Sequence, residues 1–237
     1  IEAVGTPLKD WDIHIYRGVL TGCNEAFIIN TSKRNEILSN CKDADERKRT
    51  EELIRPILRG RDIKRYGYEW AGLWLINTHN GIKGKIDRIH VEDYPAIKAH
   101  LNKYWDKIEH RADQGDTPYN LRNCVYLEDF NKPKLFYADI TQHLSFCLCR
   151  DVMYCNNTTY FITTDNEREL RHLQKYLNSP LIDWYYKTLS VQLGEKAVRM
   201  FSIYVLEIPI PPIGEDNIYE AYHLNAKEIA FIERREA

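Results

Sequence analysis

Residues 159–177, TYFITTDNERELRHLQKYL, combine two periodicities in one short stretch. Its first residues, TYFIT, are β-branched or aromatic, which favours a strand. From Leu170 to Leu177 the apolar residues recur at helical spacing, and Thr164 and Glu167 predict a capping box at the start of that helix. A strand followed at once by an amphipathic helix indicates a protein of the α+β class.

Two further β-rich runs, 134–140 and 144–150, precede this stretch and predict an antiparallel sheet with short connections. Short strands are also expected earlier in the chain, where apolar residues alternate or cluster briefly. They are predicted at 11–15, 26–29 and 73–76. We therefore expect a mixed or antiparallel sheet region that extends to about residue 164.

Helical spacing appears in several other segments. A polar helical stretch is expected at 32–53, interrupted near 40–45. A long amphipathic helix is predicted at 93–111, where Pro95 suits a first turn. A second helix at 181–189 should complete a helical pair with the helix that begins at the Thr164 capping box. A short strand near 202–206 and a terminal amphipathic helix at 213–237 should follow.

The composition of the 237 residues is that of a folded domain, with 43% hydrophobic and 29% charged residues. The formal net charge is −2, so affinity for a polyanion would have to come from local patches. The sequence contains no apolar run long enough to span a bilayer and no signal peptide, which predicts a cytoplasmic protein without a membrane partner.

The six cysteines form no CxxC pair and no spacing typical of a disulfide framework. A zinc site at His143, Cys147, Cys149 and Cys155 is conceivable. Cys147 and Cys149 alternate within a predicted strand, however, and free cysteine commonly packs as a small apolar residue. We therefore predict no metal site.

The segment 55–66 is strongly basic in a chain that is slightly acidic. Five basic residues stand against one acid, Asp62. Arginine can pair with phosphate or with the edge of guanine, and a tyrosine can pack against a sugar or base. The alternative is a solvated charged face. We predict DNA contact from the following residues: Arg59, Arg61, Lys64, Arg65 and Tyr66.

The loop at 17–24 holds two glycines, Gly18 and Gly22, which either make a plain turn or allow close approach to a phosphate. Arg17, Thr21 and Asn24 could then donate hydrogen bonds to DNA. A polar segment at 192–199 offers two more candidates. They are Lys196 and Arg199.

The segment 15–29, IYRGVLTGCNEAFII, resembles the opening of the TaqI-like C-terminal specificity domain. Further matches follow in order along the chain, from about Trp11 to Pro212. They are IRPILRGRDI at 54–63 with Tyr66, YPAI at 94–97 with Leu101, Arg111, KPK at 132–134, LNSPL at 177–181 and IPIP at 208–211. For Arg111 a structural role in capping the preceding helix is as well supported as DNA contact.

The resemblance implies that residues 1–212 are a target-recognition domain, with a sheet-rich lobe to about 164 and a helical lobe after it. Such domains are fused to adenine-specific DNA methyltransferases and to combined restriction-modification enzymes. It therefore implies double-stranded DNA and a methyltransferase domain of the same polypeptide as partners. S-adenosylmethionine, and magnesium where that protein also cleaves DNA, would be held outside this segment.

The motifs of catalysis are missing from these residues. We find no Asn/Asp-Pro-Pro-Tyr/Phe motif, no glycine-rich loop for S-adenosylmethionine and no Walker loop. Two acid-x-lysine pairs, Glu46-x-Lys48 and Asp62-x-Lys64, leave open a stand-alone metal-dependent nuclease, although short surface charge patterns match as well. The abundant tyrosines leave open a protein-interaction module. We predict that this segment is non-catalytic.

Overall fold

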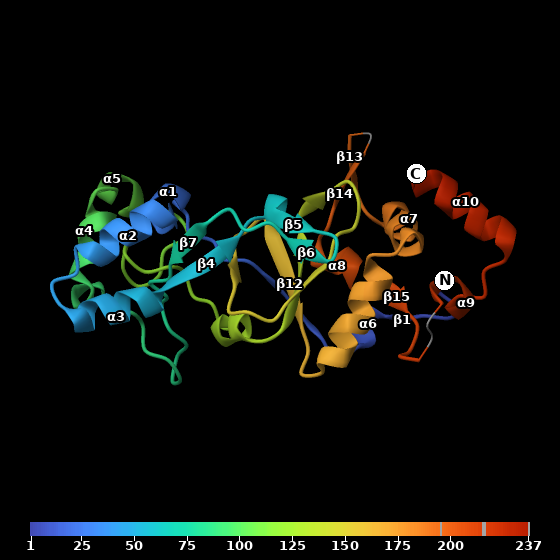
Figure 1. Ribbon diagram of the computed structural model, residues 1–237, viewed down its shortest axis with the longest axis horizontal. Coiled ribbons are helices and arrows are strands. Elements are labelled where there is room, and N and C mark those ends of the chain that lie inside the picture. The colour runs from blue at the N-terminus through green and yellow to red at the C-terminus, as the bar shows by residue number, and fades with distance from the viewer. Residues whose placement is uncertain (195, 215–216, 237) are drawn as a thin grey trace.

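The computed structural model describes residues 1–194, 196–214 and 217–236. The chain forms an elongated molecule with a sheet at its middle and helices gathered at both ends (Figure 1). The α+β class predicted from the sequence is confirmed. No helix in these described ranges has the length and apolar character needed to cross a membrane.

The middle of the molecule is a four-stranded antiparallel sheet in the order β10-β8-β12-β2. Its strands are β2 (His14–Arg17), β8 (Lys134–Ala138), β10 (Cys147–Cys149) and β12 (Thr159–Thr163). Alternate side chains of this sheet enter two different cores: Phe161 lies in the first core and Ile162 in the second. Because successive strand residues point to opposite faces, one sheet separates the two cores.

The first core lies between the middle sheet and the N-terminal helices. A second four-stranded sheet, in the order β11-β4-β7-β3, completes it. Its strands are β3 (Ile28–Asn30), β4 (Ile54–Leu58), β7 (Leu73–Ile76) and β11 (Tyr154–Cys155). The helices of this lobe are α1 (Asn24–Phe27), α2 (Thr31–Ser39), α3 (Ala44–Leu53), α4 (Pro95–Asn102) and α5 (Trp105–Ile108).

The second core lies on the opposite face of the middle sheet, beneath the C-terminal helices. These are α6 (Glu167–Leu177), α7 (Pro180–Leu189), α8 (Ser202–Val205), α9 (Ile218–Ala221) and α10 (Ala226–Glu236). β1 (Thr6–Pro7) pairs with β15 (Pro209–Ile210), which ties the N-terminus to this lobe. Tyr222 and Ile232 also belong to this core, so part of the terminal segment packs against the lobe that precedes it.

Small sheets and short 3₁₀ helices make up the remaining regular structure of the described residues. The sheets are the hairpin of β5 (Ile63–Lys64) with β6 (Gly67–Tyr68), and β9 (Ile140–Thr141) paired with β14 (Ala197–Arg199), which pairs in turn with β13 (Gln192–Leu193). The 3₁₀ helices are η1 (Leu8–Asp10), η2 (Gly60–Asp62), η3 (Val91–Asp93) and η4 (Leu127–Asn131).

Several elements differ from the prediction. The strand expected at 26–29 is α1 followed by β3: the amides of Ala26 and Phe27 donate to the Cys23 carbonyl, which makes a helical turn, and only Ile28–Asn30 pair with β7. The helix expected at 93–111 is broken into α4 and α5 by a tight turn at 103–104. The cap of α6 is Asn166, whereas Thr164 donates its hydroxyl hydrogen to Glu169.

Two C-terminal predictions are corrected as well. Residues 202–205 form α8, not a strand, and the strand of this region is β15. The single terminal helix is instead two helices, α9 and α10, and residues 215, 216 and 237 of the predicted segment lie outside the described part. A domain boundary at residue 212 stays a prediction.

Candidate nucleic-acid interface

The turn between β11 and β12 is the point where several predicted segments meet. The Nε of Arg17 donates a hydrogen bond to the Asn157 carbonyl oxygen at 3.0 Å. The amide of Gly60 donates to the Thr158 hydroxyl oxygen at 2.9 Å, and the amide of Asp139 donates to the Thr158 carbonyl at 2.9 Å. This turn therefore connects β2, η2 and the end of β8.

Three predicted arginines lie around that turn. Arg17 is exposed, with its guanidinium 5.7 Å from the centre of the Tyr160 ring. Arg199 pairs with the Asp139 carboxylate at 3.3 Å. Arg61 is exposed and directly follows Gly60, whose amide is bound to Thr158. The side chain of Arg61 has no hydrogen-bond or ion-pair partner within the described part of the chain. We call Arg17, Arg61 and Arg199 the turn arginines.

The β5–β6 hairpin carries the remaining predicted residues of the basic segment. Arg65 and Tyr66 form its two-residue connection, and Tyr66 has a φ of 67° with 59% of its surface exposed. The Tyr66 amide donates to the Phe146 carbonyl at 3.3 Å, which holds the hairpin against the middle sheet. Lys64 is exposed and lies 3.6 Å from the Glu69 carboxylate. The hairpin thus presents two cations and an aromatic ring to solvent.

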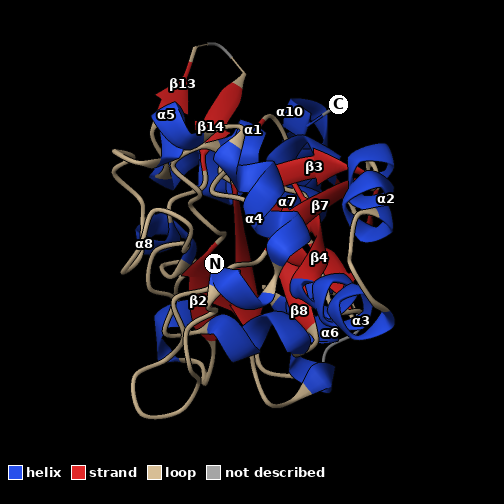
Figure 2. Ribbon diagram, turned by 90° about the vertical axis from the view of Figure 1, so that its left-hand side faces the viewer, coloured by secondary structure: helices blue, strands red, loops and turns tan. Residues whose placement is uncertain are grey.

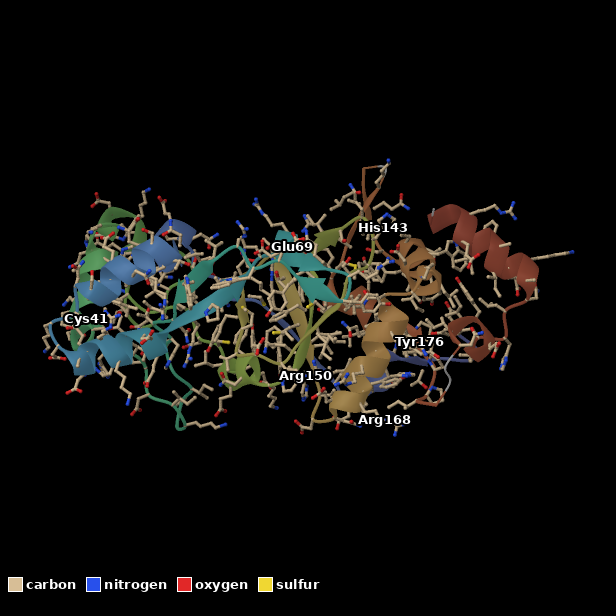
Figure 3. The ribbon with its side chains drawn as sticks, viewed as in Figure 1. Cys41, Glu69, His143, Arg150, Arg168 and Tyr176 are labelled. Atoms are coloured by element: carbon tan, nitrogen blue, oxygen red, sulfur yellow. The ribbon has the colours of Figure 1, made fainter. Side chains whose placement is uncertain are left out.

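Several of these elements lie toward one long edge of the molecule. α1, β5 and β13–β14 lie toward the upper edge in Figure 1, and α1, β13 and β14 again lie in the upper part of Figure 2, beside α5 and α10. Lys196 lies in the exposed turn between β13 and β14. In Figure 3 the labelled Glu69 and His143 lie toward this edge, whereas Arg150 and Arg168 lie toward the lower one.

Arg59 differs from its basic neighbours because it is part of an internal ion pair. Its Nη2 and Nε donate to the two carboxylate oxygens of Asp62 at 2.8 and 3.1 Å, and Asp62 is 4% exposed. The hydrogen bond to Asp62 raises the pKa of Arg59. This side chain braces η2, so it supports the neighbouring residues and is not a free cation.

Thr21 and Asn24 lie at the other predicted loop. Thr21 is buried, and its hydroxyl donates to the Asn24 Oδ1 at 2.7 Å. The loop 20–24, together with Asp113 and Asn157, lines a polar cavity of about 190 Å³. Gly18 is buried against the backbone of residues 155–156, where a Cβ would meet the Asn156 carbonyl oxygen at 2.0 Å. Gly18 therefore allows the backbone of this loop to pack closely against residues 155–156.

Arg111 is a structural residue at this loop. It is 6% exposed, and its guanidinium donates to the carbonyl oxygens of Thr21 and Pro118 at 2.7 and 3.0 Å and also to those of Asp113 and Asn120. Burial lowers its pKa to about 10. The arginine joins two loops that are distant in sequence.

Sequence reasoning missed the side chains that assemble the site from separate loops. They are Asp113, Asp139, Asn157 and Thr158. The run Asn156-Asn157-Thr158 between two strands is a turn signal, which locates a loop but does not say what the loop binds.

The acids of the nuclease alternative have structural partners. Glu46 is buried and accepts hydrogen bonds from the amides of Lys42 and Ala96, each at 2.9 Å. Asp62 is held by Arg59. Within the described residues no group of three or more histidine, cysteine or acidic side chains is arranged to hold a metal ion.

Comparisons with known proteins identify the family. The TaqI-like C-terminal specificity domain matches residues 55–210, which is more than half of the chain. No curated protein matches. The fold is similar to that of the type IIG restriction endonuclease BpuSI, with a TM-score of 0.59, 14% identity, and coverage of 94% of this chain and 27% of that chain.

It is also similar to the type IIL restriction-modification enzyme MmeI, whose structure was solved in complex with DNA. Here the TM-score is 0.61, the identity is 14%, and coverage is 97% of this chain and 28% of that chain. The chain therefore spans little more than a quarter of either enzyme. At these identities the likeness is one of fold, and the family rests on the sequence match: the chain belongs to the TaqI-like C-terminal specificity domains.

Proposed function

We propose that this chain reads DNA sequence as the specificity domain of a methyltransferase-fused type II restriction-modification enzyme. The observation that carries the proposal is the edge formed by the turn arginines and the β5–β6 hairpin. Cations and hydrogen-bond donors gather there in a chain whose formal net charge is −2. Local positive charge of this kind attracts the phosphate backbone, and arginine forks can read base edges.

The remaining functions of such an enzyme belong to other parts of a longer polypeptide in this proposal. S-adenosylmethionine, and magnesium if the protein cleaves DNA, would be bound there. The methyltransferase domain would hold the flipped adenine while this domain holds the duplex by its sequence. The small share of BpuSI and MmeI that this chain covers supports that division.

Within the edge, Arg61 and Lys64 should differ in role. The planar fork of Arg61 suits the two acceptors on the major-groove edge of guanine. The ammonium of Lys64 suits a phosphate, where a point charge needs no fixed direction. Lys64 lies 3.6 Å from the exposed Glu69 carboxylate. An exposed ion pair contributes little stability, so breaking it to bind a phosphate would cost little free energy.

The test compares Arg61→Ala and Lys64→Ala in the full-length protein that carries this chain, by fluorescence anisotropy on cognate and random duplexes across salt concentrations. Lys64→Ala should weaken binding to both duplexes and reduce the slope of log K against log salt by about one unit. Arg61→Ala should cost roughly 1–3 kcal/mol on the cognate duplex and relax the choice of one base.

The matched control is Arg168→Ala, because Arg168 is an exposed arginine toward the opposite edge of the molecule (Figure 3). It should leave affinity, site choice and salt slope unchanged. The proposal is wrong if the unsubstituted protein binds no DNA in a salt-dependent way, or if Arg61→Ala and Lys64→Ala both behave like the control.

A further inference from the structure

The polar cavity beside α1 is built from three separate parts of the chain. Its walls are the 20–24 loop, Asp113 from the segment after α5, and Asn157 from the β11–β12 turn. Asn157 also accepts the hydrogen bond of Arg17 through its carbonyl oxygen. The cavity therefore lies directly beside a turn arginine, within the surface proposed above to meet DNA.

The walls of the cavity are held in place from behind. Arg111 donates to the Thr21 carbonyl at 2.7 Å and also to that of Asp113, so a buried cation fixes two of the three walls to one another. Its guanidinium also lies 4.5 Å from the centre of the Phe27 ring. A recognition site discriminates best when its contact residues are fixed by a supporting layer of this kind.

The hydrogen bonds inside the walls leave a defined set of free groups. The Asn24 Oδ1 accepts from the Thr21 hydroxyl at 2.7 Å, so the amide nitrogen of Asn24 remains as a donor. One oxygen of Asp113 accepts from Arg122 at 3.0 Å, which leaves acceptor capacity on the carboxylate. The side-chain amide of Asn157 has no hydrogen-bond partner in the described ranges. The cavity thus offers donors and acceptors together.

We propose that this cavity reads one base of the DNA site, and that the base is an adenine. The proposal rests on the function proposed above. A carboxylate in the wall disfavours phosphate. Adenine presents an amino donor beside the N7 acceptor in the major groove, and an asparagine amide can pair with both. Asn157 is the residue assigned to that pairing, and Asp113 can share the one amino hydrogen that base pairing leaves in the groove.

The experiment uses Asn157→Ala and Asp113→Asn in the full-length protein, with selection of bound duplexes from a randomised library followed by sequencing. Asn157→Ala should reduce the preference for adenine at one position roughly 10- to 100-fold, as expected for loss of a bidentate base contact. Asp113→Asn should relax choice at the same position, because an amide can donate as well as accept. Affinity for random duplex and its salt slope should stay unchanged in Asn157→Ala, which alters no charge.

The matched control is Asp116→Asn, which makes the same change at an exposed carboxylate of the same loop that lies outside the cavity walls. It should select the same site as the unsubstituted protein. Thermal unfolding of each variant checks that the fold is kept. Asn157→Asp gives a second variant, in which a charged acceptor replaces the amide donors, so it should also lose the preference for adenine.

Three results would overturn the adenine assignment. The first is an unchanged preference at every position in all cavity variants. The second is a lost preference for a base other than adenine. In both, the unsubstituted protein still selects a site, so the proposed function stands. The third is an unsubstituted protein that selects no sequence at all, which overturns both proposals together.

Discussion

Tyr66 occupies a backbone conformation that costs stability. Its φ of 67° lies in the left-handed region, which is unfavourable by about 1–2 kcal/mol for a residue with a Cβ. The side chain gains little by packing, because 59% of the residue is exposed. A two-residue hairpin turn commonly requires a positive φ, and the exposed ring of Tyr66 is free to stack on a base in the DNA complex proposed above.

Replacing Tyr66 by glycine should therefore affect the stability of the fold and the affinity for DNA in different ways. The free energy of unfolding should stay the same or rise by up to about 1 kcal/mol, because glycine removes the backbone strain but adds chain entropy to the unfolded state. DNA binding should weaken by roughly 1–3 kcal/mol if the ring stacks on a base. Urea unfolding and fluorescence anisotropy measure the two effects.

Tyr66→Phe is the control, because it keeps the ring and its backbone strain. It should bind DNA nearly as tightly as the unsubstituted protein. Stacking by Tyr66 is excluded if the glycine variant binds DNA as well as the phenylalanine variant.

Sequence reasoning could find charged side chains but not their partners. It grouped Arg59 with Arg61, and only the structure distinguishes a guanidinium held by Asp62 from one that is free. Asp113 and Asn157 could not be connected with Asn24, because tertiary folding of three distant loops brings them to one cavity. Local sequence patterns carry no information about contacts between loops that are distant in sequence.

At the scale of the elements, prediction succeeded where the residue pattern of a segment matches its burial. The strand 159–163 is a continuous run of β-branched and aromatic residues and is buried on both faces, whereas the helix that follows is amphipathic and buries one face. Prediction failed at 202–206, where the β-rich composition forms α8. Directly after α8 the carbonyls of Leu206 and Ile208 accept from the amides of Lys9 and Leu8, a contact with the N-terminal segment that the local sequence does not reveal.

Helix α6 is held to the C-terminal connector by a histidine. The Nε2 of His172 donates to the Pro211 carbonyl at 2.8 Å, and its ring is stacked 5.9 Å from Trp11. Burial lowers the pKa of His172, because the charged imidazolium is poorly solvated there. The folded protein therefore favours the neutral ring.

This predicts a loss of stability in acid. The unfolded chain takes up a proton at His172 as pH falls below about 6.5, while the folded protein resists protonation, so stability is present above that pH and falls below it. Urea unfolding should show a lower midpoint at pH 5.5 than at pH 7.5, with a smaller difference in His172→Gln. An equal pH effect in both proteins would exclude His172 as a contributor. His79 and His100, whose pKa values are also lowered mainly by burial, should supply the dependence that remains in the variant.

At the scale of the whole molecule, the middle sheet belongs to both cores. Phe136 and Phe161 enter the first core, while Leu135 and Ile162, their neighbours on the same strands, enter the second. If this sheet unfolds, the buried residues of both cores become exposed to water. The two lobes should therefore unfold together, although each has its own helices and its own buried cluster.

The tryptophans allow that coupling to be measured, because Trp105 packs against the first core and Trp184 against the second. Variants that retain Trp105 or Trp184 as their sole tryptophan, with the other four replaced by phenylalanine, should report the same urea midpoint. Phe161→Ala should then shift both midpoints downward together. Phe161 is fully buried, and its ring centre lies 4.7 Å from that of Phe130, so its loss should cost roughly 3–5 kcal/mol.

Val125→Ala is the control for this experiment, since Val125 is 80% exposed. Its truncation should change the free energy of unfolding by no more than about 0.5 kcal/mol, so both midpoints should stay nearly the same. If Phe161→Ala moves the Trp105 midpoint and leaves that of Trp184 in place, the lobes unfold independently. The sheet would then be part of the first lobe alone. A shared transition means instead that β2, η2 and β14, which carry the turn arginines, lose their structure together.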